Sequence, residues 1–200
     1  MLSVDDFKQR LLLGEKDFLL DDVLLGREAA HVSSTNIDFL KGALSRTFSP
    51  RDDIPVDIWI VGSAKLGFAT REKVKNGIVL PRYRPFSGDS DVDVAVISDA
   101  IFGTIWHELA EHAHRATRIP WNSRYLGDYL VCGWLRPDHF PKRVRLRHCD
   151  AWWELFRRLS TERRFGPRQI RGGLFADIGH LRRYLNRSIE ECEQAEKLTL

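Results

Sequence analysis

Two apolar runs stand out in the pattern of hydrophobic and polar positions along the chain. The first spans residues 56–61 and ends at Gly62-Ser63, and the second spans residues 90–98 and begins around two aspartates, Asp91 and Asp93. Short apolar runs bounded by turn residues are typical of buried strands. Because residues two apart in a strand share a face, we expect both carboxylates on one face and the valines that follow them on the other.

Helical periodicity precedes and follows these runs. Ser3 is expected to cap a first helix that continues to Leu20, with Asp6 as the reciprocal acid and a break at Gly14. Further helices are predicted over residues 35–47 and about 101–117.

The second half of the chain predicts one more strand and then helices. The run Tyr129–Leu135 is strand-like, and apolar stripes beyond Pro141 have helical spacing, with Gly166-Pro167 and Gly172-Gly173 separating the pieces. The fold class predicted is therefore α+β, a mixed β-sheet flanked by helices, with a helical C-terminal part.

Composition sets the domain organisation. The chain is 43% hydrophobic with six tryptophans, which is enough core for one compact domain with a helical appendage. We expect residues 1–140 to form the core with N-terminal helices, and residues 141–200 to form a basic helical extension packed on it. No apolar stretch is long enough to cross a bilayer, and the first residues are acidic where a signal peptide would be basic, so we expect a cytoplasmic protein without membrane contact. The three cysteines are an odd number without close spacing, so we expect no disulfides.

The two aspartates suggest metal chemistry. Carboxylates on one strand face suit hard cations such as Mg²⁺, which takes oxygen ligands from a few carboxylates and from substrate phosphates. Paired metal ions stabilise both ends of an in-line displacement at phosphorus. The alternative is an ordinary solvated strand edge.

The Gly-Ser turn suggests a phosphate site. Gly62 allows the backbone to approach a ligand closely, the Ser63 hydroxyl is a donor, and Lys65 adds a charge, so these three residues are candidates for holding a triphosphate. The loop of residues 70–89 contains further cations, of which Arg82 and Arg84 are candidates to fold over the same phosphates. The alternative for this loop is a solvated surface excursion.

These residues together carry a family resemblance. The pattern Ile60-Val61-Gly62-Ser63, followed by Ser90-Asp91-Val92-Asp93-Val94, resembles the signature of the DNA polymerase β-like nucleotidyltransferase superfamily. The resemblance covers roughly residues 56 to 98. It implies a nucleotidyltransferase-type sheet, phosphate binding by Gly62 and Ser63, and magnesium binding by Asp91 and Asp93. The stretch between the motifs is longer than in the family, and Lys65 and Leu66 replace its familiar arginine.

The resemblance also implies a third carboxylate on a neighbouring strand, completing a site for two Mg²⁺ or Mn²⁺ ions. Asp138 and Asp128 flank the strand-like run and are the main candidates, and Asp150 and Asp57 are weaker ones. We take Asp138 as the third catalytic residue beside Asp91 and Asp93. The layout that includes residues 133–138 is similar to uncharacterised bacterial nucleotidyltransferase-domain proteins, some of them linked with phage defence.

Charge is divided along the chain. Residues 136–187 contain 14 Lys or Arg and 5 Asp or Glu, against 7 and 11 in residues 1–60. A cationic segment of this kind attracts RNA or DNA, or else an acidic protein.

The leading hypothesis is a magnesium-dependent nucleotidyltransferase that moves a nucleoside monophosphate from a nucleoside triphosphate to a hydroxyl of a nucleic acid, nucleotide or protein, in bacterial defence or a toxin-antitoxin system. The alternative is a non-catalytic protein of this fold that binds nucleic acid or a protein partner.

Overall fold

The computed structural model describes residues 2–48, 54–75, 77–116, 123–140 and 144–198. Lys142 and Arg143, which belong to the cationic segment, lie outside the described residues. The elements in chain order are α1 (Val4–Leu12), α2 (Lys16–Phe18), the π-helix η1 (Leu19–Leu24), α3 (Ser34–Phe48), β1 (Asp57–Val61), α4 (Ser63–Leu66), β2 (Lys73–Lys75), β3 (Ile78–Leu80), β4 (Val92–Ile97), α5 (Asp99–Arg115), α6 (Ser123–Val131), β5 (Trp134–Leu135), the 3₁₀ turn η2 (Pro137–His139), α7 (Arg147–Leu159), the 3₁₀ turn η3 (Arg163–Phe165), β6 (Ile170–Phe175) and α8 (Ile178–Lys197).

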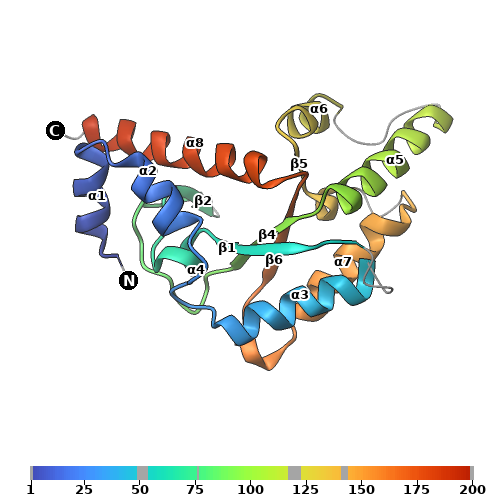
Figure 1. The fold of residues 1–200 in the computed structure, drawn as a ribbon, viewed down its shortest axis with the longest axis horizontal. Coiled ribbons are helices and arrows are strands. Elements are labelled where there is room, and N and C mark those ends of the chain that lie inside the picture. The colour runs from blue at the N-terminus through green and yellow to red at the C-terminus, as the bar shows by residue number, and fades with distance from the viewer. Residues whose placement is uncertain (1, 49–53, 76, 117–122, 141–143, 199–200) are drawn as a thin grey trace.

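A mixed sheet with the strand order β1-β4-β6-β5 forms the centre of the molecule. Strand β4 is antiparallel to β1 and parallel to β6, and β5 is antiparallel to β6. Helices lie on both sides of the sheet, with α8 and α1 on one side and α3 and α7 on the other (Figure 1). The predicted α+β class and the helix-flanked mixed sheet are confirmed.

Each face of the sheet has its own hydrophobic cluster. Val92, Val94 and Val96 pack with the apolar faces of α3, α5 and α7. Ala95 on the opposite face packs with α1, η1 and α8. The valines therefore lie on the face of β4 opposite to Asp93, as the strand alternation predicts.

Several predicted elements are confirmed. Strands β1 and β4 occupy the two apolar runs, and α3 and α5 occupy their predicted ranges within two residues at each described end. The Ser3 hydroxyl accepts from the Asp6 amide at 3.0 Å and donates to the Asp6 carboxylate at 2.6 Å. The helix it caps ends at Leu12, and Gly14, at φ +77°, separates it from α2.

The strand predicted over Tyr129–Leu135 is wrong for most of its length. Residues up to Val131 belong to α6, and only Trp134 and Leu135 pair with β6. A short apolar run fits either a helix or a strand, and here Gly133, at φ +66°, turns the chain from one into the other.

The C-terminal part, for which the sequence predicts helices, also contains a strand. Residues 170–175 form β6, which lies in the sheet between β4 and β5. The sheet thus combines strands from both sides of the predicted division at residue 140. Gly172 lies under α7, where a Cβ would come within 2.2 Å of the Phe156 ring, so this glycine is a packing site rather than a separator.

The basic loop contains regular structure as well. Strands β2 and β3 form an antiparallel hairpin within residues 70–89. Within the described part of the chain, no helix has both the length and the apolar composition needed to cross a bilayer.

Candidate functional site

The Gly-Ser turn and the second aspartate meet at one edge of the sheet. Val61, the last residue of β1, pairs with Asp93 of β4, so Gly62 lies beside the Asp93 side chain. Gly62 has φ +67°, and a Cβ at this position would be 3.1 Å from Asp93 Oδ2. Both the backbone conformation and the close carboxylate therefore require glycine here.

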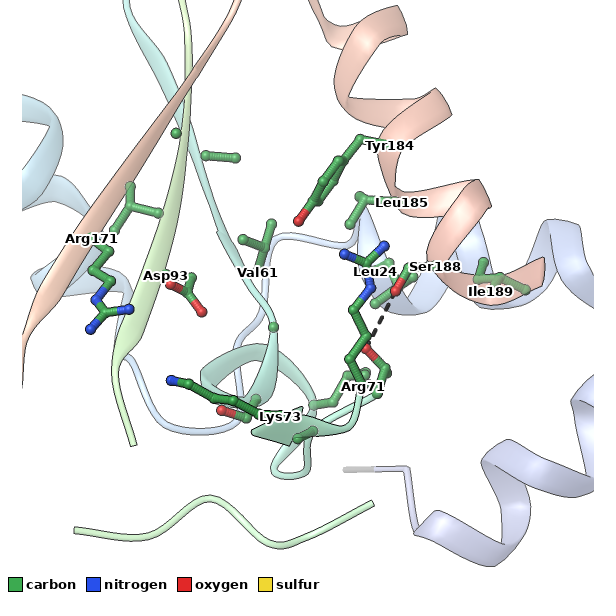
Figure 2. A pocket seen from close by; sticks show the side chains of 18 of the residues that line it. Leu24, Val61, Arg71, Lys73, Asp93, Arg171, Tyr184, Leu185, Ser188 and Ile189 are labelled. Atoms are coloured by element: carbon green, nitrogen blue, oxygen red, sulfur yellow. Dashed lines mark hydrogen bonds between the residues drawn. The ribbon is translucent and has the colours of Figure 1, made fainter. Parts of the chain in front are cut away.

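A cavity of about 380 Å³ opens over this junction. It is bounded by the sheet, the Gly-Ser turn, the β2–β3 hairpin and α8, and Figure 2 shows Asp93 and Arg171 facing Tyr184 and Arg71 across it. Its polar lining residues include Ser63, Lys73, Asp93, Arg136 and Arg171. Its apolar and aromatic lining residues include Trp134, Phe175, Tyr184, Leu185 and Ile189. We call this space the main cavity.

The two aspartates have different surroundings. Asp91 precedes β4 and does not itself line the main cavity, but its carboxylate lies 3.2 Å from Arg171 and 3.8 Å from Lys73, which do line it. Burial, together with the neighbouring Asp91 carboxylate, raises the pKa of Asp93. A cation bound between these two carboxylates would relieve that repulsion.

The third catalytic residue predicted from the sequence, Asp138, is not placed at the main cavity. Its carboxylate accepts two hydrogen bonds from the Arg136 guanidinium, at 2.9 and 2.7 Å. Burial alone would raise the pKa of Asp138, but this pairing with Arg136 outweighs burial and lowers it. The structure therefore does not bring Asp138 together with Asp91 and Asp93, because Arg136 lines the main cavity whereas Asp138 lines a separate small pocket.

The other acids considered for this role are also remote from the main cavity. Asp57 is at the opposite end of β1 and pairs with Arg27 and Lys41. Asp128 is in α6, and Asp150 is exposed at the start of α7. On β6, the strand next to β4, the residue paired with Asp93 is Arg171.

Lys65 does not line the main cavity, so the structure does not place it at the predicted phosphate site. The residue is only 6% exposed, and its ammonium donates to the carbonyl oxygens of Gly26 and Glu28. Burial lowers the pKa of Lys65 to about 8. The side chain ties the Gly-Ser turn to the segment that follows η1, so its role in this geometry is structural.

The two loop arginines are placed differently from each other. Arg82 donates to the Thr70 carbonyl and lies 3.2 Å from Cys192 Sγ, so it points toward α8 instead of the cavity. Arg84 lines the cavity and donates to the carbonyls of Arg71 and Pro81, at 2.8 and 2.9 Å. The structure therefore places Arg84, and not Arg82, at the cavity where phosphate binding is predicted.

The carboxylates present fit one magnesium ion better than two. In the part of the chain that the structure describes, no cluster of three or more histidine, cysteine or acidic side chains could hold a metal ion. Asp91 and Asp93 fit an ion that completes its octahedron with ligand phosphates and water, as Mg²⁺ commonly does. A second ion would need a third carboxylate beside these two. No such cluster is found among the described residues, and Glu72, which also lines the cavity, is exposed.

The sequence placed Arg71 in the basic loop and Arg136 and Arg171 in the cationic segment, but it did not predict that they meet in one cavity, and the aromatic wall of that cavity was missed. Arg71, Arg136 and Arg171 come from three separate segments, and Tyr184 comes from α8. The rings of Trp134, Phe175 and Tyr184 pack together, with centroids 5.6 to 6.1 Å apart. The apolar residues on either side of Gly172-Gly173 were the available signal for β6, which would have placed Arg171 beside Asp93.

Comparisons with known proteins add no relative: no family model matches the chain, and no curated protein or solved structure is significantly similar to it.

Proposed function

We propose that the main cavity binds a magnesium nucleoside triphosphate and transfers its nucleoside monophosphate to an acceptor hydroxyl. The observation that carries this proposal is the meeting of the Gly62-Ser63 turn with Asp93 in one cavity. A turn that admits a close ligand and a buried carboxylate that attracts a cation are the two elements that a metal-bound phosphate needs.

The charges and rings of the main cavity support a nucleotide as the ligand. Its lining contains five cations and two carboxylates, namely Arg71, Lys73, Arg84, Arg136 and Arg171 against Glu72 and Asp93. Arginine binds phosphate through paired donors, which suits a polyanionic tail. The lining also offers the rings of Trp134 and Tyr184 to a nucleobase, since base–aromatic stacking tolerates any base.

The proposed reaction breaks one bond at phosphorus and forms another. The acceptor oxygen bonds to the α-phosphorus, the bond to the oxygen that bridges to the β-phosphorus breaks, and pyrophosphate leaves with that oxygen. The hydroxyl proton passes to a water molecule in the cavity, because Asp91 and Asp93 act as metal ligands in this proposal. Magnesium held by Asp91 and Asp93 would supply Lewis-acid stabilisation of the phosphate oxygens. Ser63 and the cavity arginines hold and orient the tail.

One observation favours a second function, nucleotide binding without transfer. Arg171 is paired with Asp93 across β4 and β6 and lies 3.2 Å from Asp91. A guanidinium at this place favours bound phosphate and competes with a metal ion for Asp91. The protein would then use ligand binding to control a partner. A cytoplasmic location and a role in defence or in a toxin-antitoxin system stay predictions.

Transfer is tested by incubating the protein with each α-labelled nucleoside triphosphate and Mg²⁺, with and without total RNA. Asp93→Asn keeps the size of the side chain and removes its charge. Asp150→Asn makes the same chemical change at an exposed position on α7 and is the matched control. We expect label transfer and pyrophosphate release in the wild type and in Asp150→Asn, and loss of both in Asp93→Asn.

Two results would overturn the catalytic proposal. Equal transfer by the wild type and Asp93→Asn would remove Asp93 from the chemistry. Binding of magnesium nucleotide with no transfer to RNA, nucleotide or protein acceptors would favour the non-catalytic function.

A further inference from the structure

A second, smaller cavity lies on the other face of the sheet. Its volume is about 210 Å³, and Asn36, Phe86, Arg164, Gly166 and Arg168 line it together with His31. We call it the arginine notch. None of the side chains lining it is a carboxylate, so the notch is cationic.

Aromatic rings position the two arginines of the notch. The Arg164 guanidinium lies 3.7 Å from the centroid of the Phe39 ring, and that of Arg168 lies 5.0 Å from the centroid of the Phe86 ring. His31 stacks on the same Phe86 ring, with centroids 4.3 Å apart. Contacts of this kind fix the direction of a guanidinium without neutralising its charge.

Some hydrogen-bond donors of the notch arginines have only distant acceptors, or none, in the described part of the chain. Arg168 donates to the carbonyls of Phe165 and Ser87 at 3.3 and 3.4 Å, which are long distances, and its buried Nε has no hydrogen-bond partner within the described structure. Among the described residues, neither Arg164 nor Arg168 has a carboxylate within ion-pair distance. Arg157 and Arg182, by contrast, pair with Glu154 and Asp21. Free donors on a fixed guanidinium match the oxygens of a phosphate.

The notch and the main cavity share one strand of the sheet. Val92 of β4 lines the notch, and its neighbour Asp93 lines the main cavity. The Val92 amide donates to the Gln169 carbonyl at 2.9 Å, which ties the start of β4 to the segment carrying Arg168. A chain that crosses the start of β4 can therefore contact both cavities, one on each face.

We propose that the arginine notch binds a backbone phosphate of a single-stranded nucleic acid whose end enters the main cavity. The acceptor role of that end rests on the function proposed above, whereas the binding does not. Residues 136–187, which surround the notch arginines in sequence, contain 14 basic and 5 acidic residues and supply further attraction for a polyanion. A duplex is too stiff to turn around a strand start, since its persistence length is about 50 nm, so the ligand is single-stranded.

The test measures binding of a short fluorescent single-stranded oligoribonucleotide by anisotropy at several salt concentrations. Arg164→Ala/Arg168→Ala removes the notch cations. Asn36→Asp keeps the size of the side chain, adds a negative charge and removes the hydrogen bond that Asn36 Nδ2 donates to the Arg164 carbonyl at 3.4 Å. Arg157→Ala/Arg182→Ala removes the same number of positive charges from exposed helix positions and is the control. Thermal unfolding of each variant checks that the fold is retained.

We expect oligonucleotide affinity to fall about tenfold in the double notch variant and also to fall in Asn36→Asp, with a smaller salt dependence in the double variant because a phosphate contact is lost. The control should change little. Equal losses in the control would show diffuse attraction and overturn the notch. Unchanged binding in both notch variants, or no oligonucleotide binding by the wild type, would overturn it as well.

Competition and a nucleotide-binding assay separate this proposal from the function of the main cavity. Unlabelled oligonucleotide should displace the probe, and inorganic phosphate at matched ionic strength should not. If phosphate displaces it equally well, the notch is a simple anion site and the nucleic-acid assignment is wrong. Nucleotide binding lost in Asp93→Asn but retained in the notch variants would support both proposals. Absence of nucleotide binding, with the notch effect intact, would overturn only the proposed function.

Discussion

The guanidinium of Arg171 lies 3.2 Å from the carboxylate of Asp91. The two residues come from β6 and from the start of β4, which are neighbouring parallel strands. Arg171 therefore holds a positive charge at the place where a metal ion would share Asp91. Any cation that binds Asp91 has to compete with this guanidinium, while any phosphate that enters gains from it.

Replacing Arg171 should separate the binding of metal from the binding of nucleotide. In Arg171→Ala, we expect the affinity for Mg²⁺ alone to rise about threefold to fivefold, because Asp91 loses a partly exposed ion pair. Affinity for a nucleoside triphosphate should fall, because a phosphate donor is lost. Titration calorimetry with each ligand measures both changes, and Arg171→Lys, which keeps the charge, is the control. Parallel changes in the two affinities would contradict the competition.

Gly62→Ala should damage both the fold and the ligand site. Alanine is strained at φ +67°, and its Cβ would lie 3.1 Å from Asp93 Oδ2, so we expect a loss of about 1–3 kcal/mol in the free energy of unfolding. Nucleotide affinity should fall as well, because the turn and carboxylate would be pushed apart. Gly88→Ala is the control, since a Cβ added at Gly88 would meet no atom beyond its chain neighbours within 4 Å. Chemical denaturation measures stability, and equal effects of the two substitutions would exclude the specific role of Gly62.

Gly172→Ala tests the central position of β6. An added Cβ would lie 2.2 Å from the Phe156 ring, and overpacking of this kind costs about 1–3 kcal/mol of stability. At Gly173 the nearest atom that an added Cβ would meet is 3.5 Å away, which is ordinary contact, so Gly173→Ala should be tolerated. Urea denaturation of the two variants compares adjacent glycines of the same strand. A stable Gly172→Ala protein would contradict the packing of α7 on β6.

Lys65 should make the free energy of unfolding depend on pH in the alkaline range. Its pKa is about 8 in the folded protein against 10.5 for an ordinary lysine, so the unfolded chain binds more protons between these two values. Stability contributed at this position should therefore rise as pH increases from about 8 to 10.5, by at most about 3 kcal/mol. Lys65→Met removes the titrating group. The difference in unfolding free energy between the wild type and Lys65→Met, measured across this range, isolates the effect, and a difference that is independent of pH would contradict it.

The sequence was sufficient for the parts of the site that depend on local pattern. Strand alternation around Asp91 and Asp93, and the glycine at the end of the preceding apolar run, are read within a few residues. Both patterns correspond to β4 and to the turn after β1. Their meeting in space follows from the antiparallel pairing of these strands.

Partners distant in sequence decided most of the features that were mispredicted. Lys65 points away from the main cavity because the carbonyls of Gly26 and Glu28 are available beneath the turn. Asp138 is instead drawn to a near neighbour, Arg136, two residues before it. Residues 170–175 were not recognised as a strand because two glycines interrupt their apolar pattern. The glycine at position 172 is required because aromatic rings of α7 pack directly against it, a contact that the sequence does not reveal.

The most direct test of the central claim is equilibrium binding of a magnesium nucleoside triphosphate analogue with a non-cleavable bond between the α- and β-phosphates. Calorimetry on the wild type, Asp93→Asn and Asp150→Asn measures occupation of the main cavity without requiring an acceptor. We predict saturable binding to the wild type and to Asp150→Asn, and a loss of the magnesium-dependent part in Asp93→Asn. No binding to the wild type, or binding that Asp93→Asn leaves unchanged, would contradict the assignment of the main cavity as a nucleotide site.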